Sequence, residues 1–398
     1  MPSFFRLLLG LFLILYAFTL IFIAVNAKKV LSQGNDFQAQ YGAAKLIVEG
    51  KNIYDLTEEA RVQQAATGRQ TSIAEVVPFI NSPLAVVWLA PLGHMSFQMA
   101  YGVWGIFLYV LLLFMLWIIA QIYDLARLKK TAKTVLDEKG FFLLVAIVMH
   151  WSVIALFAGQ LSLILAVGLF GSFLLLHKKK DAQAGVVLSL VCVKPYLLFI
   201  PLVMLLYKRR YVSVVWCLVG IACFAVAAVV LVGLPAFGEY SDLGKNLFWI
   251  GDEPMKIHLS RQITGRALVY VATGGTGAAF TLMQAVIWGL LSVLIVYAAT
   301  RQISTTPTVS PKEWALAILV MVFTGIHMHG HDGIILLFPL VVWYARTNLN
   351  IYIRMGALVM LAVAAPVILF YAGFLISVCI ASAVLYLYYL TFHSYGSK

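Results

Sequence analysis

Apolar runs of membrane-spanning length, separated by short polar stretches, recur along the whole chain. A hydrocarbon core of about 30 Å needs roughly 20 apolar residues in a helix, because each residue adds about 1.5 Å. The pattern therefore predicts an all-α polytopic membrane protein. Two runs, 182–193 and 196–207, are short and are expected to tilt or to lie inside the bundle. We assign twelve spans, at residues 4–26, 98–122, 141–158, 161–176, 182–193, 196–207, 211–234, 281–300, 313–327, 333–345, 352–371 and 374–392.

A further apolar run at 83–93 is too short to be a span. Its helix would be about 16 Å long, roughly half of the bilayer core. If it crossed the membrane, the basic run Arg127–Lys133 would face the outside, although Lys and Arg favour cytoplasmic loops. We therefore expect an interfacial or re-entrant helix here. Both termini are then inside, and large outer loops lie at about 27–97 and 235–280.

Composition agrees with a membrane protein, since 63% of the residues are hydrophobic and only 11% are charged. The formal net charge of +12 comes largely from basic runs between apolar segments, such as His177–Lys180 and Lys208–Arg210. Such runs are typical of cytoplasmic loops, so we expect contact with membrane lipids and no nucleic-acid binding. The four cysteines lie in apolar runs without a metal-binding spacing, and the first run is interpreted as a retained signal anchor. One integral membrane domain over residues 1–398 is expected.

The first outer loop places an acidic residue, Asp36, a few positions beyond the first span. Apolar residues at helical spacing between Ala39 and Ile47 predict an amphipathic helix, which Gly50 would end. Two interpretations of Asp36 stay open. It only caps the free amides at the start of this helix, or it serves as a base for a substrate at the lipid–water boundary, a role that is compatible with capping.

Two polar breaks interrupt apolar hairpins on the same side of the membrane. Gln160 follows Gly159 between two spans, where it either forms part of a hairpin turn or hydrogen-bonds a sugar or a lipid phosphate. Lys194, which precedes Pro195, either pairs with an outer carboxylate or binds a lipid phosphate. A lysine at membrane depth costs roughly 2.5–3.5 kcal/mol on insertion scales, so a partner or an aqueous pocket is expected.

Three alternate histidines, His327, His329 and His331, stand where two late spans meet outside. They are candidates for a metal site, for contacts with phosphate or hydroxyl groups, or for structural polar packing. The second outer loop adds Arg261 and Arg266, which either clamp a phosphate or contact lipid headgroups.

The order and spacing of these elements resemble glycosyltransferase family 87 over about residues 30–345. No single element is specific, but the ordered set is. It comprises Asp36-Phe37, Tyr41, Ala44, Gly50, Tyr54-Asp55, Pro83-Leu84, Ala90-Pro91-Leu92, Gly159-Gln160, Lys194-Pro195 and His327 to Asp332.

The resemblance implies a membrane enzyme of the GT-C fold that takes sugar from a polyprenyl-phosphate donor outside the membrane. It implies an aspartate base at the outer end of the first span, which Asp36 matches, and a late histidine, which His327 matches. Our other candidate substrate-binding residues are Lys194, Gln160, Arg261, Tyr41 and His331.

We therefore expect inverting transfer of a sugar in a single displacement, with a glycolipid or glycan hydroxyl as acceptor and no cofactor or metal ion. The resemblance favours mannose, with a pentose as the other option, and an active site on the outer face of the bacterial inner membrane. A transporter or flippase for a lipid-linked or small solute is the leading alternative. A metal-binding membrane protein is a third.

Overall fold

The structure is a computed structural model, and its described part is helical without a strand. The described residues are 2–27, 35–71, 73–127, 135–249, 262–274, 278–347, 349–372, 375–376 and 378–382. The α-helices are α1 (Pro2–Val25), α3 (Phe37–Val48), α4 (Leu56–Thr67), α5 (Val86–Leu89), α6 (Phe97–Ala126), α7 (Val135–Val148), α8 (His150–Phe157), α9 (Ser162–His177), α10 (Asp181–Leu188), α11 (Phe199–Tyr207), α12 (Tyr211–Val232), α13 (Pro235–Trp249), α14 (Gly265–Thr273), α15 (Ala278–Thr300), α16 (Pro311–Thr324), α17 (Leu337–Arg346) and α18 (Ile351–Ala372). The 3-10 turns are η1 (Ile73–Glu75), η2 (Pro83–Ala85), η3 (Ala90–His94), η4 (Ser189–Val193), η5 (Pro195–Leu198) and η7 (Gly330–Leu336).

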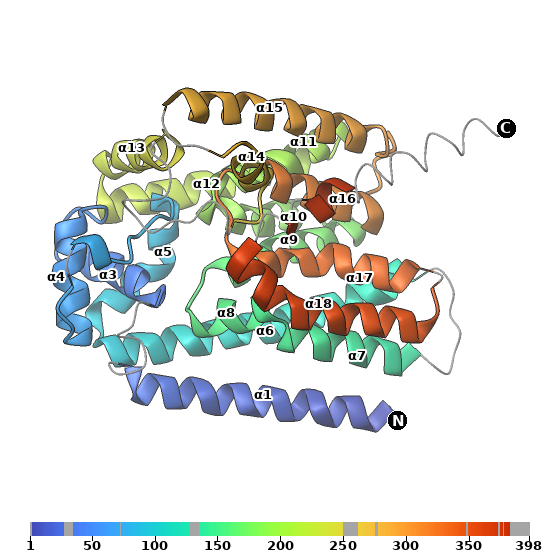
Figure 1. Cartoon of the computed structure of the whole chain (residues 1–398), viewed down its shortest axis with the longest axis horizontal. Helices are drawn as coiled ribbons and strands as arrows, with labels where there is room; N and C mark the ends of the chain where they lie inside the picture. The colour runs from blue at the N-terminus through green and yellow to red at the C-terminus, as the bar shows by residue number, and fades with distance from the viewer. Residues whose placement is uncertain are drawn as a thin grey trace.

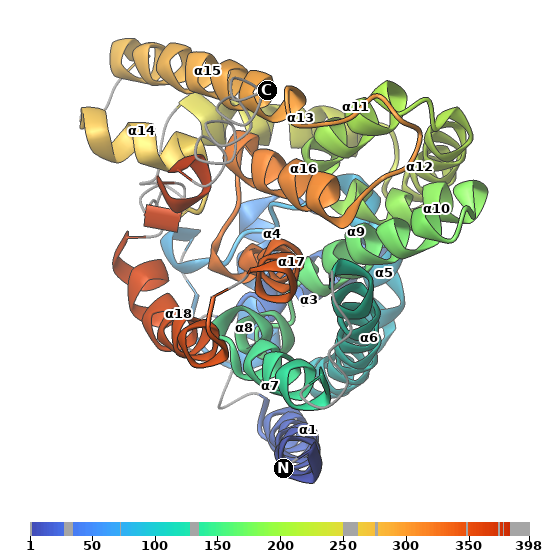
Figure 2. The ribbon, with the colours of Figure 1, turned by 90° about the vertical axis from the view of Figure 1, so that its right-hand side faces the viewer.

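The long helices form a bundle with a helical cap at one end. In Figure 1, the axes of α1, α6 and α7 lie nearly parallel, and α3, α4 and α5 gather at the left end, away from the N-terminus. Helices α1 and α15 lie on opposite sides of the molecule in both views, and α1 and α17 are seen nearly end-on in Figure 2. The segment that was expected to form the first outer loop therefore builds the cap.

Three described helices are long and apolar enough to cross a membrane, namely Phe97–Ala126, Tyr211–Val232 and Phe280–Thr300. A fourth span is possible if the pair Glu138–Val148 and His150–Phe157, bent by 48°, counts as one. The other predicted spans stay predictions, since within the described residues several of those apolar runs, such as α9 and α11, form shorter helices. The predicted span at 374–392 lies mostly outside the described residues.

Prolines begin two of the irregular segments, η5 at Pro195 and η2 at Pro83. The predicted spans at 182–193 and 196–207 become α10, η4, η5 and α11, with the interruption at Lys194-Pro195. Proline has no N–H to donate and its ring clashes with the preceding turn, so it disfavours a regular helix interior. The run at 83–93 likewise forms only the short turns η2, α5 and η3, as expected for a segment that does not span. These turns pack on α3, where a Cβ on Gly93 would come within 2.1 Å of the Ala44 carbonyl oxygen.

Polar contacts connect loops that the charge pattern assigns to the same side of the membrane. Among loops assigned to the inside, Lys208 pairs with Glu313 at 2.5 Å and Arg210 with Asp181 at 2.9 Å. Among loops assigned to the outside, the Ser82 hydroxyl donates to the Cys192 carbonyl at 3.2 Å. The packing of the bundle is thus consistent with the predicted alternation of inner and outer loops.

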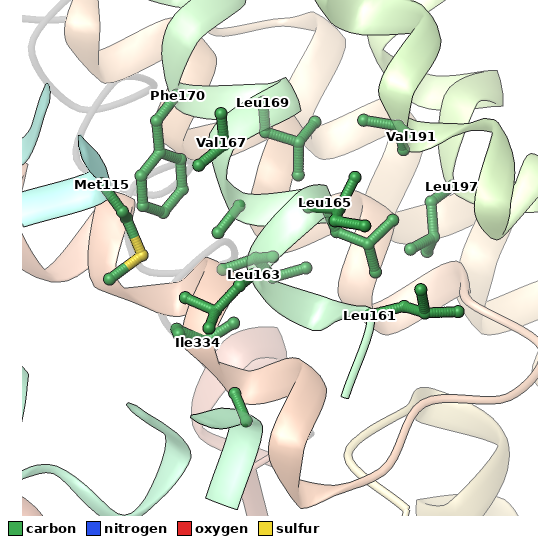
Figure 3. Packing of buried hydrophobic residues seen from close by; sticks show 14 of the residues in the cluster. Met115, Leu161, Leu163, Leu165, Val167, Leu169, Phe170, Val191, Leu197 and Ile334 are labelled. Carbon is green, nitrogen blue, oxygen red and sulfur yellow. The ribbon is translucent and has the colours of Figure 1, made fainter. Parts of the chain in front are cut away.

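Helix α9 is the centre of the bundle. Its residues are apolar on every side, and nearly all of them are buried. Figure 3 shows Phe170 of α9 near Met115 of α6 and Leu163 near Ile334 of η7, while Leu165 lies on the side of Val191 and Leu197. A helix that is hydrophobic all round requires burial on all sides. The turn that precedes α9 is therefore held by the most buried element of the described fold.

Helices α10 and α12 cross so closely that their backbones touch. An added Cβ on Gly185 would come within 2.2 Å of the Ser213 carbonyl oxygen and 2.9 Å of the Cys217 nitrogen. Backbone atoms cannot move aside as a flexible side chain can, so this crossing requires glycine.

We predict that Gly185→Ala destabilises the protein by about 1–3 kcal/mol, because the added methyl overpacks the crossing. The matched control is Gly289→Ala on α15, where nothing lies within 4 Å of an added Cβ. That change should be neutral or slightly stabilising, since alanine favours helix. Thermal unfolding in detergent measures both. Equal melting temperatures for the two variants would contradict the close crossing.

A buried carboxyl group secures the cap. Glu59 of α4 is fully buried, and both of its oxygens accept from the Phe79 N–H at 3.1 Å. Burial raises the pKa of Glu59 to about 8, and nearby Asp55 adds to the rise, whereas the Phe79 hydrogen bond opposes it. The protonated form is therefore the one that suits this site.

Because the folded pKa exceeds the unfolded value, the contribution of Glu59 to stability is complete below a pH of about 4.5. It is lost as the pH rises through about 8. We predict that Glu59→Gln removes this loss, so that the variant gains melting temperature relative to the wild type as the pH rises across that window. A constant difference between the two proteins at every pH would show that Glu59 does not titrate there.

Candidate active site

Asp36 lies at the N-terminus of α3 but does not cap it. The Asp36 side chain makes no capping hydrogen bond to the helix. Asn35 makes the local contact instead, since its Oδ1 accepts from the Phe37 N–H at 2.9 Å. Both residue types are good caps, so the sequence alone could not tell which of them would act. The structural interpretation of Asp36 as a cap is therefore wrong, and its carboxylate is left for another role.

Gln160 is the partner of Asp36. It lies in the turn between α8 and α9, where Gly159 adopts a φ of +72°. This left-handed conformation suits glycine, which has no Cβ to clash. The Gln160 Nε2 donates a hydrogen bond to Oδ2 of Asp36. Two residues that are 124 positions apart in the sequence thus meet at the N-terminal end of α9.

A buried ion pair lies close to this contact. The Lys194 Nζ is 2.5 Å from Oδ2 of Asp332, and the Ser162 hydroxyl donates to Oδ1 of the same carboxylate at 2.7 Å. The backbone N–H of His329 adds a third hydrogen bond at 3.0 Å. Burial by itself raises the pKa of Asp332, but the Lys194 ammonium, His331 and the hydrogen bonds outweigh it and lower the pKa below its usual value. Asp332 is therefore an anion that Lys194 neutralises.

His331 lies near both carboxylates. Its Nε2 is 3.7 Å from Oδ2 of Asp332, and the Asp36 carboxylate is also near enough to act on it. Burial is the largest influence and lowers the pKa of His331, while the two carboxylates oppose the shift. His331 therefore favours the neutral form, able to donate from one ring nitrogen and accept at the other.

His327 presents a free donor beside this cluster. The Gln262 Nε2 lies 3.0 Å from the His327 Nδ1. An amide nitrogen can only donate, so in a neutral ring the proton of His327 is on Nε2. That Nε2 is buried and has no hydrogen-bond partner within the described residues. The Tyr196 hydroxyl donates to the His327 carbonyl and fixes the backbone of this turn.

The structure thus brings together five of the predicted site residues, namely Asp36, Gln160, Lys194, His327 and His331. Tyr41 has a packing role, because its ring is buried beside Phe37 and its hydroxyl donates to the Met95 carbonyl at 3.0 Å. A substrate contact of Tyr41 stays a prediction. Arg261 lies outside the described residues.

Asp332, Ser162, Gln262 and Tyr196 were not predicted as site residues. Asp332 ends the His327 to Asp332 motif and Ser162 follows Gly159-Gln160 by two positions, so their position beside predicted residues was the available signal. No sequence signal separates Gln262 and Tyr196 from other polar residues near a span. No group of three metal-ligating side chains is placed to hold a metal ion in the described part of the chain.

The sequence model of glycosyltransferase family 87 matches residues 79–326, which is more than half of the chain. The chain belongs to glycosyltransferase family 87. It is therefore a glycosyltransferase, and the apolar helices make it a membrane protein. No curated protein and no solved structure matches it.

The family match confirms the predicted family and covers a narrower range than the predicted 30–345. It includes Gln160 and Lys194 but begins after Asp36 and ends before His327. The structure therefore connects residues inside the matched region of this glycosyltransferase to residues outside it, through the Asp36–Gln160 and Lys194–Asp332 contacts.

We predict that Lys194→Met lowers the free energy of unfolding by about 3–5 kcal/mol, because it leaves the Asp332 anion buried without its cation. The double variant Lys194→Met with Asp332→Leu should recover most of this loss. The control is Lys139→Ala, whose 2.7 Å pair with Asp124 is exposed and should contribute less than about 1 kcal/mol. Denaturation in detergent compares them, and a Lys194→Met variant as stable as Lys139→Ala would contradict a buried pair.

Proposed function

We propose that this family 87 enzyme transfers a sugar from a polyprenyl-phosphate donor to a hydroxyl group of an acceptor, with Asp36 as the general base. One observation carries the proposal. The Asp36 carboxylate does not cap its helix and is instead held by Gln160 near the histidine turn. A carboxylate that is free of a structural role and close to neutral imidazole groups can accept a proton from a bound substrate.

The reaction is a single displacement at the anomeric carbon. The acceptor oxygen forms a bond to this carbon from the face opposite the phosphate, and its proton passes to the Asp36 carboxylate. The bond between the anomeric carbon and the phosphate oxygen breaks, and its electron pair stays on the polyprenyl phosphate. Attack from the opposite face inverts the configuration of the sugar.

Charge develops on the leaving phosphate, and hydrogen-bond donors that are already in place stabilise it. The buried His327 Nε2 proton has no partner among the described residues, and His331 is a further imidazole beside Asp332. Lys194 is a weaker candidate for direct charge neutralisation than the sequence suggested, because Asp332 already balances its charge. A phosphate ester leaves readily, so the proposal uses no metal ion or other cofactor.

The site lies on the outer face of the membrane in this proposal, within a GT-C-type fold of about twelve spans. Support comes from the charge pattern, which gives the inner loops the basic runs, and from contacts that join outer-assigned loops to one another. The surrounding membrane would be the bacterial inner membrane. There, polyprenyl-phosphate sugars and an acceptor glycolipid or glycan can both reach the cap.

The family resemblance favours mannose as the sugar. Membership of a transferase family favours this reaction over the transporter or flippase that composition alone allowed. No observation on the described residues favours transport, and the Asp36–Gln160 contact has a direct use in transfer.

We predict that Asp36→Asn lowers the transfer rate by about 10²–10⁴-fold, because the amide cannot accept the proton. The assay uses purified protein in detergent with a labelled polyprenyl-phosphate sugar and a lipid extract as acceptor. The matched control is Asp55→Asn. Asp55 caps α4 by accepting from the Thr57 and Glu58 N–H groups, and asparagine caps equally well.

The control should therefore keep its transfer rate. Near-normal transfer by folded Asp36→Asn protein would overturn the assignment of the base. Loss of transfer in both variants would show only that the cap is sensitive to change, and would remove the support for Asp36 specifically.

A further inference from the structure

Gln160 was expected to contact the substrate, but its amide is directed at Asp36. Only the NH₂ group of the amide can donate to a carboxylate, so the contact fixes the orientation of the amide. The side chain is 7% exposed, which leaves little freedom for other conformations. In the described part of the chain, Gln160 is the one side chain that donates a hydrogen bond to the Asp36 carboxylate.

The turn that carries Gln160 is fixed from several directions. The Trp104 Nε1 donates to the Gly159 carbonyl at 2.8 Å, and the Tyr101 hydroxyl donates to the Phe157 carbonyl at 2.9 Å. The Gln160 N–H itself donates to the Ala155 carbonyl at 3.0 Å. Both ring donors come from α6, which does not otherwise contribute to the cluster. These contacts hold the backbone of the turn, and with it the start of the Gln160 side chain, in one position.

The two segments also touch next to the contact. An added Cβ on Gly159 would come within 3.0 Å of the Phe37 side chain. Phe37 follows Asp36, and Gly159 precedes Gln160, so packing of the first pair sets the register of the second. Phe37 is fully buried, with its ring edge-on to Tyr101 at 5.2 Å between centroids. The position of Asp36 relative to Gln160 is therefore set by a packed apolar contact.

We propose that Gln160 is a positioning residue that holds one oxygen of Asp36 and leaves the other oxygen for the proton of the acceptor hydroxyl. This inference rests on the proposed role of Asp36 as the base. It replaces the direct contact of Gln160 with sugar or phosphate that the sequence suggested. Asn35 makes the local contact at the start of α3, which leaves the Asp36 carboxylate free of that contact. Gln160 then orients this carboxylate.

The two roles of Gln160 differ in kinetics. A positioning residue acts on the rate of the chemical step, and misplacement of a reacting group by about 1 Å can cost about 100-fold. A residue that only binds substrate raises KM and leaves kcat unchanged. We expect Gln160→Leu to lower kcat about 10–100-fold, with KM for donor and acceptor changed by less than about twofold.

Gln160→Glu supplies a readout that a purely structural role would not affect. It places a second carboxyl group beside Asp36, and one of two carboxyl groups that share a site keeps its proton to higher pH. The acid limb of the kcat profile should therefore move to higher pH in this variant. A general loss of structure would lower kcat by the same factor at every pH.

The control is Gln63→Leu in the full-length chain. Gln63 is a buried glutamine of α4 whose amide makes two hydrogen bonds to the Val77 backbone, at 2.8 and 3.1 Å. Its loss costs stability, but kcat per folded molecule should not change. If Gln160→Leu does not fold, Gln160→Asn keeps the amide and withdraws it by one methylene, and the same fall in kcat is expected.

A raised KM with unchanged kcat, or wild-type kinetics in Gln160→Leu and Gln160→Glu, would overturn the positioning role. Asp36→Asn, measured in parallel, separates the two claims. If Asp36→Asn is inactive while the Gln160 variants behave as wild type, only the positioning role fails. If Asp36→Asn is active, the proposed base fails, whatever the Gln160 variants do.

Discussion

The buried ion pair between Lys194 and Asp332 is the constraint on which the site depends. A charge inside an apolar bundle is tolerated only with a partner of opposite sign and with hydrogen bonds to its remaining positions. The pair meets both needs, since Ser162 and the His329 backbone donate to the same carboxylate. It joins the Lys194-Pro195 break, the start of α9 and η7, and so holds three separate segments at one point.

The geometry of the histidine turn follows from this pair. Asp332 accepts from the backbone of His329 and lies 3.7 Å from His331, so the ion pair also sets the course of the chain between α16 and α17. On the other side, Ser162 begins α9 directly after the turn that carries Gln160. The Asp36 contact and the histidine turn are thus positioned from one anchor. The central, almost entirely buried α9 keeps that anchor from moving.

Local features of the fold could be predicted from the sequence. The helix after Asp36, its end near Gly50, the turn at Gly159 and the break at Lys194 all follow from residue chemistry at neighbouring positions. The pairing of distant polar groups could not be predicted, because it depends on how the helices pack. The same holds for the choice between Asn35 and Asp36 as the cap. No proline or glycine marks the bend at Met149 in the sequence, so the break within the predicted span at 141–158 could not be predicted.

The central claim is that the Asp36 carboxylate lies beside the acceptor hydroxyl, on the face of the lipid-linked sugar opposite its phosphate, while the histidine turn receives the phosphate. A cryo-EM structure of the Asp36→Asn protein with bound polyprenyl-phosphate sugar tests it most directly. The account predicts the side chain of residue 36 within reach of an acceptor oxygen on the face opposite the phosphate, with the phosphate against His327 or His331. A donor bound with its phosphate away from this turn, or with residue 36 on the same face as the phosphate, would contradict it.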